Sequence, residues 1–216
     1  MPRIIGIFGG TFDPVHYGHT KTISQLLSII PFKKVVVIPS AKPPHKERVI
    51  ASFEDRIAMT RLAFKNQKKV LVDGREALRS GPSYAIDTVK DFLTEEKNTQ
   101  IVLILGSDAF AKIDTWHMWK ELFGLANFVV IKRPYYPVSW RKRSLRAINR
   151  KNNLEDLTSS EGTGKVIEIK LNPIQISSSK IRKGFTMGKN VERLVGSKVR
   201  EYLISHQVYG SENSIK

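Results

Sequence analysis

The sequence predicts an α/β fold: a Rossmann-like, doubly wound and mostly parallel sheet with helices on both faces and a small helical part at the C-terminal end. Two observations predict it. Short apolar runs alternate along the chain with segments of helical periodicity. Several of these runs are apolar throughout, which is typical of parallel strands covered on both faces. The chain has 216 residues, 41% of them hydrophobic, which suffices for one core, so we expect a single domain over residues 1–216.

The elements can be assigned in order from these patterns. Strands are expected at Ile4–Phe8, Lys34–Ile38, Val70–Gly74, Ile101–Leu105, Phe128–Ile131 and Val166–Ile169. Helices are expected between them, at Thr20–Ile30, Phe53–Asn66, Tyr84–Glu96 and Trp116–Phe123. Because such sheets bind ligands at the carboxyl ends of their strands, the residues that follow each strand are the first candidates for a functional site.

The C-terminal third has a different character. The regular alternation ends at two prolines, and residues 139–165 are polar and basic, so we expect a variable insertion or a helix-loop there. Residues 177–209 are expected to form the C-terminal helical part, with helices at Ser177–Gly184 and Ser197–Gln207. The serines fit helix N-caps, and Gly184 fits a C-cap.

The composition restricts the partners. The formal charge of +16 suits a polyanionic ligand such as ATP, nucleic acid or an acidic membrane surface, although a solvated basic surface explains it equally well. The densest basic run, residues 132–151, contains eight Lys or Arg and no acid. It lacks regularly interleaved aromatic residues, so nucleic-acid binding as the main function is disfavoured.

The sequence also bears on the compartment. No apolar run approaches the roughly 20 residues needed to cross a bilayer, and the N-terminus lacks the pattern of a signal peptide. The chain has no cysteine, which excludes disulfides and thiolate metal sites and is compatible with a reducing compartment. These observations predict a cytoplasmic protein with no membrane partner.

The most informative stretch is residues 6–19, which read GIFGGTFDPVHYGH. Gly9 and Gly10 allow a tight turn and the close approach of a ligand. His16 and His19 are expected to share a face of the first turn of the next helix, whose free N–H groups attract phosphate. The motif predicts a nucleoside triphosphate site where imidazoles stabilise charge on phosphate oxygens. A metal site is disfavoured, because no third protein ligand lies at a matching spacing.

Two further segments carry cations beside a strand end or a helix start. The loop 39–46 is stiffened by prolines and presents Lys42, His45 and Lys46 after the second strand. The segment Ile176–Arg182 opens a helix with three serines, and its arginine can reach the same phosphate oxygens. Taken alone, each has a plainer explanation: a surface loop in the first case, an N-cap with a solvated arginine in the second.

A fourth group of residues follows the middle strands. It comprises Gly81–Thr88, Gly106–Asp108 and Thr115–His117, the last of which is expected to begin a helix. Trp116 could stack on a flat heteroaromatic ring. Equally, Trp116 and Trp119 could form one packed face of a helix, and the residues alone leave both explanations open.

Together these segments resemble the bacterial nicotinate-nucleotide adenylyltransferases, part of the HxGH nucleotidylyltransferase superfamily. The resemblance runs from about residue 4 to Tyr209. It is carried by residues 6–19, Pro43–Lys46, Gly81–Thr88, Gly106–Ala109, Thr115–His117, Lys132–Pro134 and Ile176–Arg182.

The resemblance implies transfer of AMP from ATP to nicotinate mononucleotide, giving nicotinate adenine dinucleotide and pyrophosphate in NAD biosynthesis. It also implies Mg²⁺, bound mainly through the ATP phosphates, with no protein side chain assigned as a metal ligand. The phosphate of the mononucleotide would attack the α-phosphorus in line, so catalysis consists of positioning and charge stabilisation. The implied catalytic residues are His16, His19, Lys46 and Arg182. The implied ATP-binding residues are Gly9, Gly10, Gly18, Gly106, Asp108 and Ser179. The implied mononucleotide-binding residues are Thr11, Phe12, Tyr84, Thr88, Trp116 and Arg133.

The chain departs from the family pattern at three positions. Ser179 stands where threonine is common, Ser107 replaces a common alanine, and Tyr135 replaces a common glycine. Two alternatives to the implied function remain: a related enzyme acting on nicotinamide mononucleotide or pantetheine phosphate, and a basic nucleic-acid-binding protein.

Overall fold

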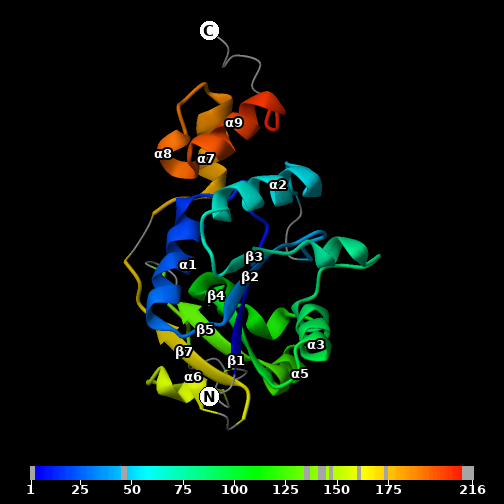
Figure 1. Cartoon of the computed structure of the whole chain (residues 1–216), viewed down its shortest axis with the longest axis vertical. Helices are drawn as coiled ribbons and strands as arrows, with labels where there is room; N and C mark the ends of the chain where they lie inside the picture. Colours follow the sequence, from blue (N-terminus) through cyan, green and yellow to red (C-terminus); the bar gives the residue numbers. More distant parts are fainter. Residues whose placement is uncertain are drawn as a thin grey trace.

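The described strands form one fully parallel, seven-stranded sheet in the order β3-β2-β1-β4-β5-β7-β6 (Figure 1). The computed structural model describes residues 3–44, 48–133, 137–140, 145, 148–159, 162–172 and 175–210. The strands are β1 Arg3–Gly10, β2 Lys34–Pro39, β3 Val70–Val72, β4 Thr99–Gly106, β5 Asn127–Ile131, β6 Asn149–Lys151 and β7 Lys165–Ile169. The predicted fold class is confirmed.

Helices cover both faces of this sheet (Figure 1). They are α1 Tyr17–Ile29, α2 Phe53–Phe64, α3 Ala85–Glu95, α4 Ser107–Phe110, α5 Trp119–Leu125, α6 Glu155–Thr158, α7 Ser178–Thr186, α8 Glu192–Val195 and α9 Ser197–Ser205, with short 3₁₀ turns η1 Arg75–Leu78 and η2 Ile113–Thr115. The alternation of side chains along β1 explains the two layers. Ile4 and Phe8 pack with α1 on one face, whereas Ile5 and Ile7 pack with α3 and α5 on the other.

The strand order reverses beside β1. From β1 the chain runs outward through β2 and β3 on one side, and it returns to β4, β5 and β7 on the other. The carboxyl ends of β1 and β4 therefore border the topological switch point, where a doubly wound sheet opens a crevice for a ligand.

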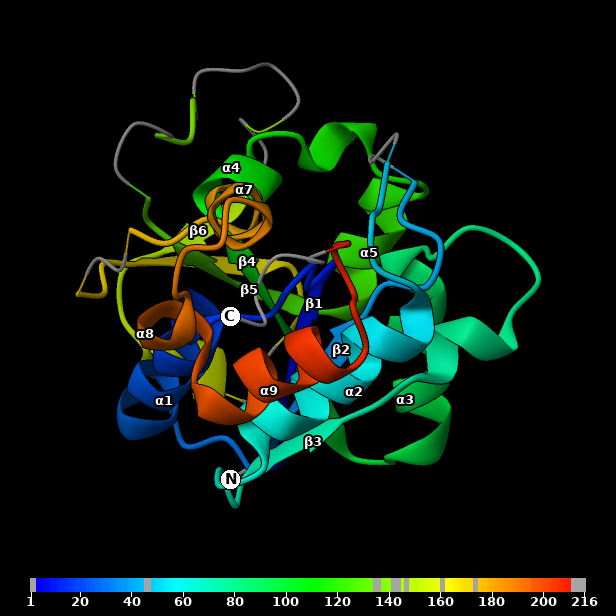
Figure 2. The same ribbon diagram turned by 90° about the horizontal axis from the view of Figure 1, so that it is seen from above.

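The C-terminal helical part lies beyond this carboxyl edge (Figures 1 and 2). Helix α9 packs on α2, and α8 packs on α9 and α1. The segment from β7 to α7 thus brings the C-terminal part of the chain back to the carboxyl edge of the sheet, where the glycine-rich motif of residues 6–19 lies.

Two expected helix boundaries are wrong. Trp116 does not begin a helix, because it follows the 3₁₀ turn η2 and Met118 has a left-handed backbone with φ of +50°. Helix α5 starts only at Trp119, so the two tryptophans do not share one helix face. Gly184 is not a C-cap either, since α7 continues to Thr186 and the left-handed residue that follows is Gly188.

The insertion 139–165 also differs from the expected helix-loop. Its described part contains β6, which pairs in parallel with β7 at the edge of the sheet, and the four-residue helix α6. The three residues of β6 are polar and basic, so neither apolar runs nor alternation marks them as a strand.

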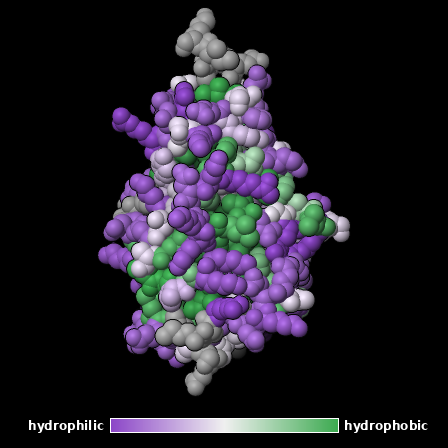
Figure 3. Space-filling model, in the orientation of Figure 1, coloured by the Kyte–Doolittle hydropathy of each residue, from purple (hydrophilic) through white to green (hydrophobic). Residues whose placement is uncertain are grey.

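Hydrophilic side chains dominate the visible surface, with hydrophobic residues in patches between them (Figure 3). This agrees with the basic composition of the chain. Among the described residues, no helix is both long enough and apolar enough to span a membrane.

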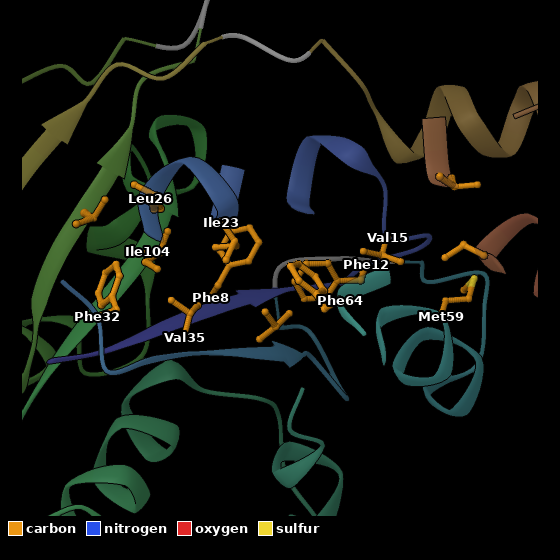
Figure 4. Close-up of a cluster of buried hydrophobic side chains, with 14 of the residues drawn as sticks. Phe8, Phe12, Val15, Ile23, Leu26, Phe32, Val35, Met59, Phe64 and Ile104 are labelled. Atoms are coloured by element: carbon orange, nitrogen blue, oxygen red, sulfur yellow. The ribbon is translucent and has the colours of Figure 1, made fainter. Parts of the chain in front are cut away.

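Phe32 tests the packing of the central strand. Its ring is 1% exposed and lies beside Val35 and Ile104 over the position of Gly6 (Figure 4). Replacing it with alanine leaves a cavity in this layer, so Phe32→Ala should lower the free energy of unfolding by about 3–5 kcal/mol. Urea denaturation measures this, with Leu78→Ala as the control, because Leu78 is 89% exposed. Equal effects of the two substitutions would contradict the packing described.

Candidate active site

A cavity of about 760 Å³ opens at the carboxyl edge of the sheet, beside the switch point. Its walls come from the ends of β1, β2 and β4, from the loops after β2 and β3, and from the segment between α4 and α5. Seven of the residues that the resemblance implied line it, namely Gly9, Gly10, Thr11, Tyr84, Thr88, Asp108 and Trp116.

One buried guanidinium organises the loops beside the cavity. Arg56 on α2 is 2% exposed and donates hydrogen bonds to four backbone carbonyls. Nη1 bonds the carbonyls of Thr11 at 2.9 Å and Ser40 at 2.6 Å, while Nη2 and Nε bond those of Ala41 and Ala51 at 3.4 and 3.3 Å. The loops after β1 and β2 are thereby joined to the start of α2.

The two motif histidines stack at the start of α1. Their ring centroids are 3.8 Å apart at an interplanar angle of 23°. His16 is the N-cap rather than part of the first turn, which corrects the expected placement, and His19 occupies the third helical position. Gly18 permits this arrangement, because a Cβ at this position would lie 2.8 Å from the His16 ring.

The hydrogen bonding of His19 assigns its neutral tautomer. Its Nδ1 accepts a hydrogen bond from the backbone N–H of His16 at 3.2 Å. Nδ1 is therefore unprotonated and the ring proton sits on Nε2, which makes Nε2 the donor of the neutral ring. Phe12, buried and with φ of +50°, supports this ring edge-on at 5.0 Å.

His16 is buried and uncharged at neutral pH. Its ring is 6% exposed, and Nδ1 has no hydrogen-bond partner within the described structure. Burial, reinforced by the positive charge of Arg133, lowers the pKa of His16 to about 4. At neutral pH the imidazole is therefore an uncharged hydrogen-bonding group and carries no positive charge.

The N-terminus of helix α7 lies against the loop between β1 and α1. Ser178 Oγ donates to the carbonyl of Pro14 at 3.0 Å. Arg182 Nη1 donates to the carbonyl of Asp13 at 2.5 Å and lies 3.6 Å from its carboxylate. Ser179 is exposed at the helix start, with its hydroxyl 2.7 Å from that of Ser177. Two helix N-termini therefore meet beside the cavity.

Arg133 and Asp108 connect the histidines to the cavity. Arg133 Nη1 bonds the Asp108 carboxylate at 3.2 Å, and its backbone N–H bonds Ser107 Oγ at 3.0 Å. A Cβ on Gly106 would lie 2.4 Å from Asp108 Oδ1 and 2.7 Å from Arg133 Nε, so this approach requires glycine. Asp108 lines the cavity, while Arg133 lies close enough to His16 to influence its charge.

The opposite wall is aromatic. Tyr84, at the start of α3, stacks on His117 with ring centroids 4.2 Å apart and an interplanar angle of 24°. Trp116, which precedes His117 in the chain, lines the cavity together with Tyr84 and His117. A flat ligand ring therefore has stacking partners at this end.

A buried carboxylate at this wall was not singled out in the sequence. Glu76 on η1 is 8% exposed and lines the cavity, and its Oε1 accepts a hydrogen bond from Thr88 Oγ1 at 3.1 Å. Arg79 in turn donates to the same hydroxyl at 3.1 Å. Burial raises the pKa of Glu76, against the lowering effects of its hydrogen bonds and of Arg79. Only the fold brings Glu76 to Thr88, so no local pattern could have identified it.

The remaining predicted residues have different outcomes. Lys46, with its neighbour His45 and with Tyr135, lies outside the described residues. Lys42 Nζ donates to the carbonyl of Ser80 at 3.0 Å. The other predicted residues do not line the cavity but gather at the N-termini of α1 and α7 or around the side chain of Arg133. They are Phe12, His16, Gly18, His19, Gly106, Arg133, Ser179 and Arg182.

Comparison with known proteins places the chain in a family. A family model described as cytidylyltransferase-like matches residues 7–184. The chain belongs to this family. Within it, the probable nicotinate-nucleotide adenylyltransferase of Pseudomonas putida (strain GB-1) is 35% identical over 213 residues, 98% of this chain and 97% of the relative. A protein of the same name from Hydrogenovibrio crunogenus is 33% identical over 96% of this chain and 98% of its own length. The chain therefore belongs to the nicotinate-nucleotide adenylyltransferases, as the sequence resemblance predicted, and is a nucleotidyltransferase.

Solved structures agree with this fold. The Plasmodium falciparum nicotinic acid mononucleotide adenylyltransferase complexed with NaAD superposes with a TM-score of 0.76, covering 97% of this chain and 98% of its own. A second structure of that enzyme, complexed with APC, gives a TM-score of 0.74. The sequence identities of 19% and 18% mean that these likenesses concern the fold.

The low pKa of His16 predicts an acid-sensitive fold. The unfolded ring gains its proton near the ordinary value of 6.5, whereas the folded ring does so only near 4, so stability is present above pH 6.5 and is lost as the pH falls toward 4. Between pH 7 and pH 5 the wild type should lose about 2 kcal/mol more unfolding free energy than His16→Asn. Urea denaturation at both pH values measures the difference, and equal losses would contradict the assignment.

Proposed function

We propose that the chain transfers the AMP part of ATP to nicotinate mononucleotide, giving nicotinate adenine dinucleotide and pyrophosphate. The observation that carries this proposal is the meeting of the N-termini of α1 and α7 beside a cavity whose far wall is aromatic. Such helix starts attract phosphate, and aromatic rings accept a flat heterocycle. Family membership supports the same reaction.

The triphosphate is proposed to lie across the two helix N-termini. Its oxygens would accept hydrogen bonds from three sources. These are His19 Nε2–H, the N–H groups of Arg182 that do not bond Asp13, and the backbone N–H groups at the start of α7. Ser179 and Lys46 complete the proposed set. These groups stabilise the negative charge that builds on the leaving pyrophosphate, which is where preorganised donors lower the barrier most.

The mononucleotide is proposed to occupy the cavity with its pyridine ring at the aromatic wall, against Trp116. Its phosphate would then point toward the histidines, where Thr11, Gly9 and Gly10 leave the approach open. A phosphate oxygen forms the bond to the α-phosphorus of ATP while the bond from that phosphorus to the bridging oxygen breaks. The protein supplies alignment and charge stabilisation, and no covalent intermediate is needed.

The residues present fit a Mg²⁺ ion that arrives with ATP. Across the described ranges, no three His, Cys, Asp or Glu side chains cluster as a set of metal ligands. Asp108 presents a carboxylate to the cavity, and its Oδ1 is buried with no hydrogen-bond partner among the residues that the structure describes. Mg²⁺ is commonly bound through one or two carboxylates plus substrate phosphates, where it neutralises phosphate charge. We propose Asp108 as the side chain that contacts it.

Pyrophosphate release from ATP and Mg²⁺ tests the proposal directly. The assay is run with nicotinate mononucleotide, nicotinamide mononucleotide and pantetheine phosphate in parallel. Turnover should be highest with nicotinate mononucleotide. A preference for either other acceptor would reassign the substrate within the family, and no release with any of them would overturn the proposed reaction.

His19 is the first residue to test. Removing its Nε2–H donor should lower kcat by about 10²-fold or more, the scale for one preorganised donor, so His19→Ala should be nearly inactive. His206→Ala is the matched control, because His206 is exposed at the end of α9. Initial rates and a thermal melt of both variants measure the effect. A folded His19→Ala variant with wild-type turnover would remove His19 from the proposed role.

Trp116 tests the aromatic wall. Loss of ring stacking should raise KM for nicotinate mononucleotide about tenfold or more in Trp116→Ala and leave KM for ATP within about twofold. Trp119→Ala is the control, because Trp119 packs edge-on against Phe123 at 6.0 Å, outside the cavity wall. Steady-state kinetics in both substrates decide the point. If the two variants behave alike, Trp116 is a packing residue.

A further inference from the structure

Asp13 joins three separate parts of the chain at the edge of the phosphate site. It is 2% exposed and lies in the loop between β1 and α1. Its Oδ2 accepts the backbone N–H of Ile50 at 2.9 Å, and its Oδ1 accepts that of Ala51 at 3.2 Å. Oδ1 also accepts the hydroxyl of Tyr209 at 2.8 Å, 196 positions along the chain.

The same residue holds the arginine of α7. Arg182 Nη1 donates to the backbone carbonyl of Asp13 at 2.5 Å but lies 3.6 Å from its carboxylate. The ion pair is therefore loose, because both carboxylate oxygens already accept other donors. Within the described residues, the remaining N–H groups of Arg182 have no hydrogen-bond partner. In the described part of the chain the guanidinium is thus held through Nη1 alone.

The surroundings of Tyr209 keep its hydroxyl protonated, so that it acts as a hydrogen-bond donor. Its side chain is 8% exposed and packs edge-on against Phe185 of α7, with ring centroids 6.3 Å apart. Burial, followed by the negative charge of Asp13, raises the pKa of Tyr209, whereas Arg182 and Arg56 act in the opposite sense. The hydroxyl remains protonated and keeps donating to Oδ1.

We propose that Tyr209 and Asp13 are positioning residues that hold the Arg182 guanidinium in the orientation that binds the triphosphate of ATP. The Tyr209 hydroxyl and the two backbone N–H groups together engage both carboxylate oxygens and weaken the pull of the carboxylate on Arg182, so Arg182 is not drawn into a tight pair with it. Without the hydroxyl, Oδ1 loses its closest donor and Arg182 turns toward the carboxylate, which then competes with phosphate. The inference rests on the proposed function, since ATP is its substrate.

A purely structural role for Tyr209 makes a different prediction, and the chain offers a matched control. Tyr202 on α9 donates its hydroxyl to Asp55 Oδ1 at 3.0 Å, again tying the C-terminal part to the rest of the chain. Neither Tyr202 nor Asp55 lines the cavity or contacts Arg182. Tyr202→Phe therefore removes an equivalent tyrosine–aspartate hydrogen bond away from the site.

The experiment measures Tyr209→Phe and Tyr202→Phe for kcat and KM in both substrates, and for the affinity of a non-hydrolysable ATP analogue by calorimetry. Tyr209→Phe should lower the affinity for the analogue and lower kcat/KM for ATP about tenfold, while KM for the mononucleotide stays within about twofold of the wild-type value. Tyr202→Phe should leave all of these near wild type. In an Arg182→Ala background, Tyr209→Phe should have no further effect on kcat/KM for ATP, because its action passes through Arg182.

Three outcomes overturn the inference. Tyr209→Phe could bind the analogue like the wild type, it could change the kinetics no more than Tyr202→Phe does, or its effect could persist in full without Arg182. Failure of the proposed function looks different. In that case the wild type releases no pyrophosphate with any mononucleotide, and the affinities for the analogue alone then decide the role of Tyr209.

Discussion

The structure at the carboxyl edge depends on the buried guanidinium of Arg56. Among the described residues no carboxylate hydrogen-bonds it; instead it bonds the carbonyls of Thr11, Ser40, Ala41 and Ala51, which lie on the loops beside the cavity. Burial lowers the pKa of Arg56, and the nearby charge of Asp13 is foremost among the effects that oppose it. A buried charge is tolerated only when its hydrogen bonds are satisfied, so these loops cannot move apart without exposing an unpaired cation. The loops beside the cavity are therefore held in position by the fold itself.

The local features of the fold could be predicted, because they depend on residues that are close together in the sequence. Apolar runs located every described strand except β6, and the glycine-rich motif located the turn between β1 and α1. Features that depend on distant residues could not. The left-handed Met118 that delays α5 has no local signal, and Arg56 reads as an ordinary helix residue until three loops close around it. The same applies to Glu76 at the cavity wall and to the contact of Tyr209 with Asp13, whose partners are assembled only by the complete sheet.

The overall positive charge of the chain explains little of the site by itself. At the centre of the site, His16 is buried and uncharged, and Arg133 is paired with Asp108. Arg182 is held at one corner by the carbonyl of Asp13. The proposed attraction for phosphate would therefore come from oriented N–H groups and two helix N-termini more than from an excess of lysine, and such oriented dipoles need little reorganisation when charge develops on a ligand.

Two separate sets of elements border the site. The helix starts of α1 and α7, fixed to each other by the Ser178 and Arg182 contacts, face one end, while the η1–α3 and η2–α5 connections form the aromatic wall at the other. The two sets follow different strands of one sheet, since α1 and α7 come after β1 and β7, whereas the η1–α3 and η2–α5 connections come after β3 and β4. If phosphate chemistry resides in the first set, selection of the acceptor falls to the second, where Glu76, Tyr84 and Trp116 line the cavity. A family built on this sheet can then change its acceptor by altering the connections and keep its reaction by keeping the helix starts.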